Sequence, residues 1–148
     1  MTEPHDSEKT YRAIGRFIYE FSMVEFVIRL KLAEEIGLDK RHKAVVESYD
    51  VGMLCAVAKD IFTKSRAEEN AALINSLINE FFELNSIRNR VAHGLWQPQL
   101  EGGTVRHVPR SLIPKRSPSQ AAELEKNADE ANALVRRLLQ AIKESALK

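Results

Sequence analysis

Four polar residues share one helix face in the middle of this 148-residue chain: Asn85, Arg88, Asn89 and His93. On a helix of about 100° per residue, Asn85 and Arg88 fall within the apolar stripe of residues 74–81, and Asn89 lies at its edge. If the helix extends as far as His93, that residue lies beyond Asn89 on the same side. Arginine is a permanent cation whose planar fork suits oxyanions. Histidine, which titrates near pH ~6.5, can take up or release a proton. The group could therefore bind an anion and move a proton.

Polar groups on a core-facing surface need partners, because burying them unpaired costs several kcal/mol each, to order of magnitude. Glu25 is the one charged residue in the apolar stripe of the N-terminal segment, and we expect it to face Arg88. This pair also supports a purely structural interpretation, in which His93 simply favours the end of the helix dipole. Glu25 is interpreted as a partner of Arg88, with a general base as the alternative role.

The sequence Arg88-Asn89-Arg90-Val91-Ala92-His93, read as R-N-x-x-x-H, resembles the signature of the HEPN superfamily. That superfamily consists of small α-helical domains, and many are metal-independent endoribonucleases of toxin–antitoxin, abortive-infection and CRISPR-associated defence. The surroundings are similar as well, with a long apolar helix before the motif, a glycine after it, then a loop and a closing helix. The resemblance covers most of the chain, although its sharp motif is six residues long.

The resemblance implies a homodimer that brings two motifs into one cleft and cleaves RNA without a metal or cofactor. Arg88 would contact the scissile phosphate, His93 would transfer a proton or bind the phosphate, and Asn89 would orient the pair. Asn85 and Glu25 would support them. Attack by the ribose 2′-OH would leave a 2′,3′-cyclic phosphate and a 5′-hydroxyl. An antitoxin protein would be a further partner.

One position departs from the resemblance. Toxins of this superfamily that are paired with a nucleotidyltransferase antitoxin often carry a modified Tyr two residues after the histidine, where this chain has Leu95. Control by that modification is therefore in doubt.

A basic segment follows the motif. Residues 104–116 contain no acidic residue and four cations, Arg106, Arg110, Lys115 and Arg116. Such a segment is usually just solvated, but its position after the motif also fits contact with an RNA backbone. Two other function classes stay open: a non-catalytic HEPN-like module that binds RNA, a nucleotide or a protein, and a helical regulator or scaffold.

The composition is that of an ordinary globular domain, with 44% hydrophobic residues, 29% charged residues and a net charge of +1. This charge excludes a globally basic nucleic-acid coat and an acidic tail. The single cysteine, Cys55, cannot form an internal disulfide, and no Cys/His cluster has zinc-ligand spacing. No apolar run approaches the ~18 residues of a membrane span, so we expect a cytoplasmic protein.

The periodicity predicts helices over about 7–36, 51–62, 66–92 and 117–142, with a short helix or an ordered loop over 38–48, in a single domain that covers residues 1–148. The fold class is all-α, a bundle of four main helices with an irregular insertion before the last one. Gly102-Gly103 could close a β-hairpin there, between residues 99–101 and 104–106.

Helix ends and a second apolar series complete the prediction. Asp6 or Ser7 could cap the first helix, Gly37 could end it, and Ser117 could cap the last helix. The first helix carries a second apolar series at coiled-coil spacing, which is either core or a dimer seam. The series comprises Tyr19, Met23, Phe26 and Leu30.

Overall fold

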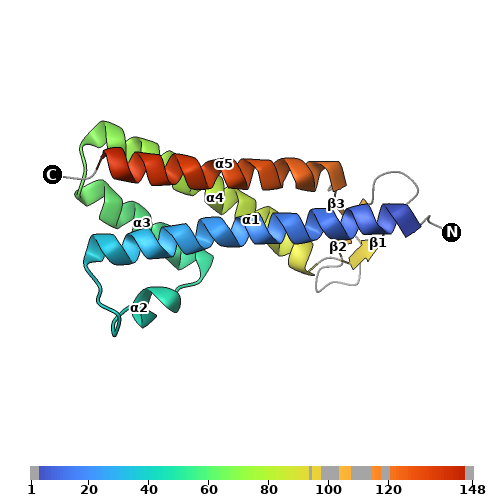
Figure 1. The fold of residues 1–148 in the computed structure, drawn as a ribbon, viewed down its shortest axis with the longest axis horizontal. Coiled ribbons are helices and arrows are strands. Elements are labelled where there is room, and N and C mark those ends of the chain that lie inside the picture. Colours follow the sequence, from blue (N-terminus) through green and yellow to red (C-terminus); the bar gives the residue numbers. More distant parts are fainter. Residues whose placement is uncertain (1–3, 94, 98–103, 108–114, 118–120, 146–148) are drawn as a thin grey trace. The chain divides into compact units, whose positions relative to one another are not determined.

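The computed structural model describes residues 4–93, 95–97, 104–107, 115–117 and 121–145 (Figure 1). The described part holds helices α1 (Pro4–Ile36), α2 (Ala44–Glu47), α3 (Val51–Lys64), α4 (Glu68–His93) and α5 (Ala121–Glu144). The predicted all-α class is confirmed. The described helices number five: four long ones, and the single turn α2 within residues 38–48, where a short helix or an ordered loop is expected.

The helix ends follow from local chemistry. Gly37 adopts a φ of +79°, and Leu38 N donates to Ala33 O at 3.0 Å, so a Schellman turn ends α1 where the sequence predicts. Asp50 caps α3 by accepting from Met53 N at 2.8 Å. Two predicted caps are wrong: α1 already begins at Pro4, a favoured first helical residue, and Ser117 lies in a strand.

The residues group into two compact units. The first unit comprises Met1–Phe21 and Leu84–Ala131, and the second comprises Ser22–Glu83 and Asn132–Lys148. Helices α1, α4 and α5 each contribute residues to both units. The single domain expected from the length therefore stays a prediction.

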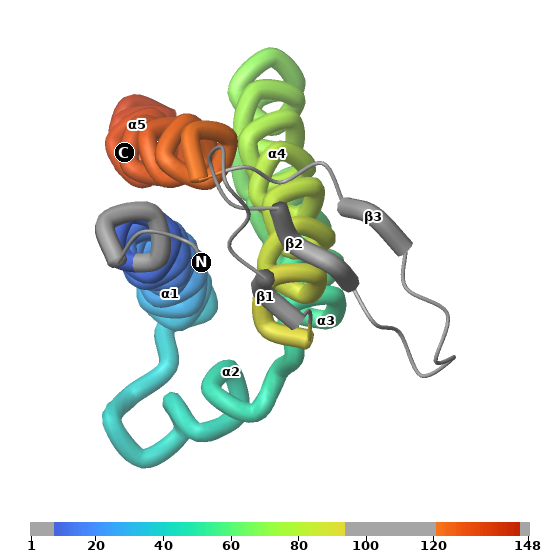
Figure 2. The backbone as a smooth tube through the Cα atoms, turned by 90° about the vertical axis from the view of Figure 1, so that its right-hand side faces the viewer, coloured from blue at the N-terminus to red at the C-terminus, as the bar shows by residue number. Residues whose placement is uncertain are grey.

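The second unit is built around the apolar stripes of α1, α3, α4 and α5. Its largest fully buried side chains each contribute about 1.5–3 kcal/mol of transfer free energy. They are Ile28, Leu32, Leu54, Phe62, Ile74, Leu77, Ile78, Phe81, Leu134 and Leu138. Figure 2 shows how α2 and the turns beside it lead from the end of α1 to the start of α3.

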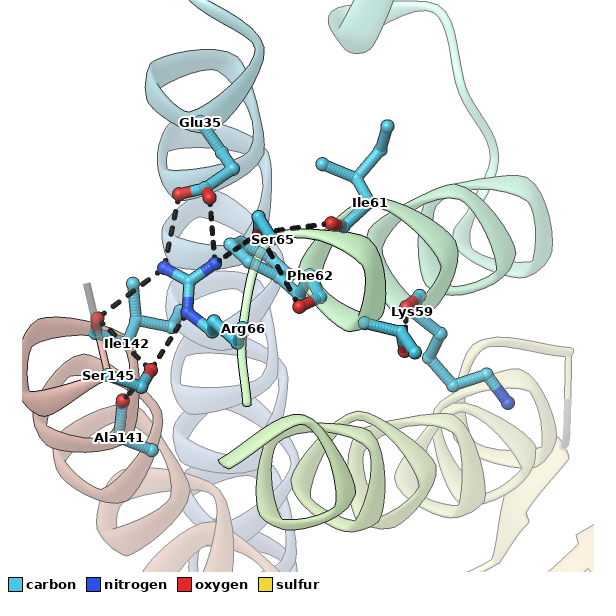
Figure 3. A network of polar contacts seen from close by, with 10 residues as sticks. Glu35, Lys59, Ile61, Phe62, Ser65, Arg66, Ala141, Ile142 and Ser145 are labelled. Atoms are coloured by element: carbon cyan, nitrogen blue, oxygen red, sulfur yellow. Dashed lines mark hydrogen bonds and ion pairs between the residues drawn. The ribbon is translucent and has the colours of Figure 1, made fainter. Parts of the chain in front are cut away.

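A buried arginine joins three elements of the second unit (Figure 3). Arg66 donates to both oxygens of Glu35, at 2.7 and 3.1 Å, and to Ser145 Oγ at 2.8 Å. Its guanidinium also lies 4.8 Å from the ring centroid of Phe62. The end of α1, the turn before α4 and the end of α5 are thereby tied together.

The first unit has its own smaller core. Phe17 and Phe21 of α1 pack with their ring centroids 6.2 Å apart, and both are buried. Small and aliphatic side chains complete the core: Ala13, Leu84, Val91, Leu124, Ala128 and Ala131. Arg16 of α1 forms ion pairs with Glu125 and Asp129 of α5 at the rim of this core.

Three short strands belong to the first unit: β1 (Leu95–Gln97), β2 (Thr104–His107) and β3 (Lys115–Ser117). They pair antiparallel in the order β1-β2-β3, with Trp96 opposite Val105. The strand predicted over 104–106 falls within β2, which pairs with β1 and β3. The rest of the predicted hairpin, its strand over 99–101 and its turn at Gly102-Gly103, lies outside the described residues.

The second apolar series of α1 is largely open to solvent. Tyr19 is 63% exposed and Phe26 is 58% exposed, so the core interpretation is wrong for both residues. Solvent contact of this kind leaves apolar surface available to a partner. None of the helices in the described part is long and apolar enough to cross a membrane.

Candidate functional site

The candidate site lies on the last two turns of α4, within the first unit. The helix continues to His93, so Asn85, Arg88, Asn89 and His93 all project from one regular helix. Asn85 and Arg88 are half-buried, whereas Asn89 and His93 are exposed. This gradient is the one that the helical wheel predicts. It gives the site a fixed inner part and a solvent-facing outer part.

Arg88 rests on an aromatic ring. Its Cζ lies 5.3 Å from the ring centroid of Phe21, a residue that is only 3% exposed. Nη2 of Arg88 donates to Asn85 Oδ1 at 3.1 Å. The ring and the amide hold the guanidinium in place without neutralising its charge.

The hydrogen-bonding capacity of Arg88 is not used up. Its Nε is buried and has no hydrogen-bond partner in the described structure. A buried unpaired donor costs about 1–3 kcal/mol, more for a charged group. A buried donor without a partner calls for an explanation, and a ligand that accepts a hydrogen bond from Nε would provide one.

The charge of Arg88 is also unusual for this protein. Among the arginines whose burial the structure describes, each of the other partly or fully buried ones has a carboxylate partner: Arg16 pairs with Glu125 and Asp129, Arg29 with Glu25, and Arg66 with Glu35. Among the described residues of the first unit, no carboxylate lies in ion-pair distance of Arg88. Its fork is therefore a cationic site that an incoming anion could neutralise.

The structure records an ion pair of Glu25 with a residue other than Arg88. Its oxygen lies 3.6 Å from Nη2 of Arg29, one helical turn further along α1. Glu25 belongs to the second unit and Arg88 to the first, and the expected pair between them stays a prediction. Arg29 follows Glu25 by four residues, a spacing at which two side chains of one helix can pair.

The outer residues of the site are accessible from solvent. His93 is the last residue of α4, and its exposed imidazole can reach a group that approaches from outside. Arg90, also exposed, donates from Nε to Ser86 O at 3.4 Å. An exposed histidine and a half-buried arginine near the end of one helix offer one group for proton transfer and one for anion binding.

Two parts of the predicted basic segment form strands β2 and β3. The register places Arg106 of β2 opposite Arg116 of β3, and His107 opposite Lys115. Backbone pairing therefore brings three of the four predicted RNA-contacting cations onto adjacent strands. The fourth, Arg110, lies outside the described residues.

Phe21 is the site residue that sequence reasoning missed. The pattern assigns it to the apolar stripe of α1, and it is indeed buried. Its contact with Arg88 joins positions far apart in the chain, and periodicity carries no information about such a contact. An arginine predicted to lie in an apolar stripe is nevertheless a signal to look for an aromatic partner.

Metal ligands and relatives give no further assignment. Among the described residues, no group of three or more His, Cys, Asp or Glu side chains could hold a metal ion. Comparisons of the chain with protein-family models, with curated proteins and with solved structures find no match in any of the three.

Proposed function

We propose that this protein is a HEPN-like, metal-independent endoribonuclease of a toxin or phage-defence system. The observation that supports the proposal most directly is the state of Arg88. It is half-buried, held by Phe21 and Asn85, and has a buried Nε without a partner. A structural arginine in this protein has a carboxylate, as Arg66 does, whereas an arginine that binds phosphate must keep its fork free.

The proposed reaction is attack by a ribose 2′-OH on the adjacent phosphate. The 2′-oxygen loses its proton and bonds to phosphorus, and the bond from phosphorus to the 5′-oxygen breaks. Arg88 stabilises the charge that develops on the non-bridging oxygens, and His93 transfers a proton. Asn89 orients the two, and the products are a 2′,3′-cyclic phosphate and a 5′-hydroxyl.

A homodimer suits this chemistry because the reaction needs both a base and an acid. The 2′-OH gives up a proton while the 5′-oxygen gains one. One motif supplies a single histidine, so two copies in one cleft would supply both groups. The cations of β2 and β3, which follow the motif in the chain, would contact the RNA backbone.

The test is cleavage of a labelled RNA by purified protein in EDTA. We expect cleavage by the wild type and a loss on the order of 10²–10⁴ in rate for His93→Ala and for Arg88→Ala. His42→Ala and Arg136→Ala, which alter exposed residues elsewhere, are the matched controls and should cleave as the wild type does. Termini carrying a cyclic phosphate should be found at the cut.

The failures of this test are informative in different ways. Equal cleavage by wild type and both site variants would mean a contaminating nuclease and would refute the proposal. Salt-dependent RNA binding without cleavage would favour the non-catalytic binding module. A stable dimer with no RNA binding at low salt would favour the scaffold class. Light scattering that gives a monomer of ~17 kDa at micromolar concentration would refute the composite site.

A further inference from the structure

A groove between α1 and α2 lies in the second unit and takes no part in the proposed chemistry. It has a volume of about 270 Å³. Its apolar lining residues are Phe26, Leu30, Ala33 and Val46, which we call the floor. Arg29 also lines it, and the two remaining charged lining residues, Lys43 and Glu47, are called the rim. We refer to it as the α1–α2 groove. A cavity of about 150 Å³ already holds a benzene-sized group, so this groove can accept a large apolar side chain.

The wall of the groove is held in place by one arginine. Arg29 of α1 donates from Nη1 to Val46 O and from Nη2 to Tyr49 O, both at 2.7 Å. A helix of four residues, such as α2, is too short to be stable by itself. Arg29 therefore fixes α2 against α1, and the groove is formed before any ligand arrives.

The floor of the groove presents apolar surface to water. Phe26 is 58% exposed, although it belongs to the regular apolar series of α1. Val45, the neighbour of Val46 on α2, is 51% exposed. Covering such side chains gains about 25 cal/mol for each Å² removed from water. The floor thus favours an apolar occupant.

Cations outnumber carboxylates around the groove: Lys43 and Glu47 both line it, and Lys40 and Arg41 lie in the turn just before Lys43. Lys43 is half-buried at the rim, and the structure records no ion pair for it within the described ranges. Lys40 and Arg41 are exposed in the turn just before it. Their acidic neighbour Asp39 is already bonded to His42, with Oδ1 2.7 Å from Nδ1. An acidic occupant would complement these cations.

We propose that the α1–α2 groove binds a segment of another protein that inserts one large apolar side chain and carries Asp or Glu beside it. The apolar floor selects the anchor, and the three cations select the acidic flank. A nucleic acid would match the cations but not the apolar floor, whereas an acidic peptide matches both. The inference does not rest on the proposed nuclease function.

The test pans a random twelve-residue peptide display library against the intact protein. Enriched peptides should carry a bulky apolar residue next to acidic residues. The best one, synthesised with a fluorescent label, should bind at least about tenfold more weakly to Phe26→Glu, because this substitution places a charge in the groove. Phe82→Glu, on an equally open phenylalanine of α4 in the same unit, is the matched control and should bind as the wild type does.

The charge argument has its own variant. Lys43→Glu should weaken the same peptide several-fold, with a smaller difference at high salt. Lys143→Glu, at an exposed lysine near the end of α5, should have no effect. Circular dichroism should show the same helix content for all variants, because these substitutions lie at exposed or half-buried positions.

Three outcomes would overturn the inference. The library could enrich nothing, it could enrich neutral or basic peptides, or the peptide could bind Phe26→Glu as tightly as the wild type. A fourth outcome would replace the occupant. If no peptide binds and Phe26→Glu converts a dimer into a monomer in light scattering, the groove is covered by a second copy of this chain and the proposal is wrong.

Discussion

Replacing Glu35 by glutamine tests how strongly one buried ion pair supports the second unit. The side chain of Arg66 is 1% exposed and that of Glu35 is 24% exposed. Every N–H of the Arg66 guanidinium has an acceptor: both oxygens of Glu35, the hydroxyls of Ser65 and Ser145, and Ile142 O. Glu35→Gln keeps the shape but removes the countercharge.

The expected loss of stability follows from this geometry. Breaking a fully buried pair by removing one partner costs about 3–5 kcal/mol, because a buried charge is left uncompensated. Glu35 is a quarter exposed, so water can partly replace its charge, and we expect about 2–3 kcal/mol. For a chain of this length, 1 kcal/mol lowers the Tm by about 2–4 °C, which predicts a fall of about 4–12 °C.

The exposed pair of Arg137 and Glu80 is the matched control. It has the same two-pronged geometry, with distances of 2.9 and 3.2 Å, but its side chains are 52% and 46% exposed. Solvent-exposed pairs of this kind contribute about 0–1 kcal/mol. Glu80→Gln should therefore lower the free energy of unfolding far less than Glu35→Gln does at pH 7.

The effect should also depend on pH. The guanidinium of Arg66 holds the pKa of the Glu35 carboxyl below its ordinary value of 4.5. The stability from this pair is therefore complete above pH ~4.5 and is lost as the pH falls through the lowered pKa. The Glu35→Gln variant lacks this ion pair at every pH. The difference in unfolding free energy between the wild type and the variant should therefore narrow in acid.

Urea unfolding at several pH values, followed by circular dichroism, measures both effects. The double variant Glu35→Gln, Arg66→Met should be less destabilised than the sum of its single variants by at least about 1 kcal/mol, because it leaves no buried charge. A Glu35→Gln variant as stable as Glu80→Gln, or a difference that does not change in acid, would refute the reasoning.

The remaining predictions concern single side chains. Phe21→Leu should slow RNA cleavage by about 2–30-fold, because the aromatic contact with Arg88 is lost. Phe17→Leu should not slow cleavage, and equal effects of the two variants would contradict the role given to the Phe21 ring. Burial raises the pKa of the Cys55 thiol to about 11, so a thiol reagent at pH 8 should react only in denaturant, and rapid labelling of the folded protein would contradict this. Leu124→Ala should cost about 2–5 kcal/mol in urea unfolding, and a loss below 1 kcal/mol would contradict its complete burial.

Several features could be predicted because they depend on local rules. Helical periodicity located α3 and α4 to within a few residues, and Gly37 ends α1 as expected. The helical wheel also places Arg88 closer to the core than His93, and in the structure Arg88 is half-buried while His93 is exposed. The start of α5 was not predicted, because Ser117, a good capping residue, is instead paired in β3.

Which side chains a neighbouring helix covers was harder to predict than where each helix lies in the sequence. The spacing of apolar residues in the last helix predicts a buried face of Leu124, Ala128, Ala131, Val135, Leu138 and Ile142. All of these are buried except Val135, which is half-buried, and Leu134 beside it is buried. A shift of one residue rotates a side chain by about 100°, and the position of the neighbouring helix decides which side chain it covers. The same cause left Tyr19 and Phe26 exposed.

The sequence by itself determined the all-α class, the main helices and the placement of Asn85, Arg88, Asn89 and His93 on one helix face. These features follow from turns, caps and a period of 3.6, which are set by neighbours in the chain. Only the tertiary structure decided that Arg88 rests on Phe21 without a carboxylate from its own unit, while Arg66 has one from its unit. A charge acquires its partner from whichever element folds against it, and such contacts between distant segments leave no pattern in the sequence.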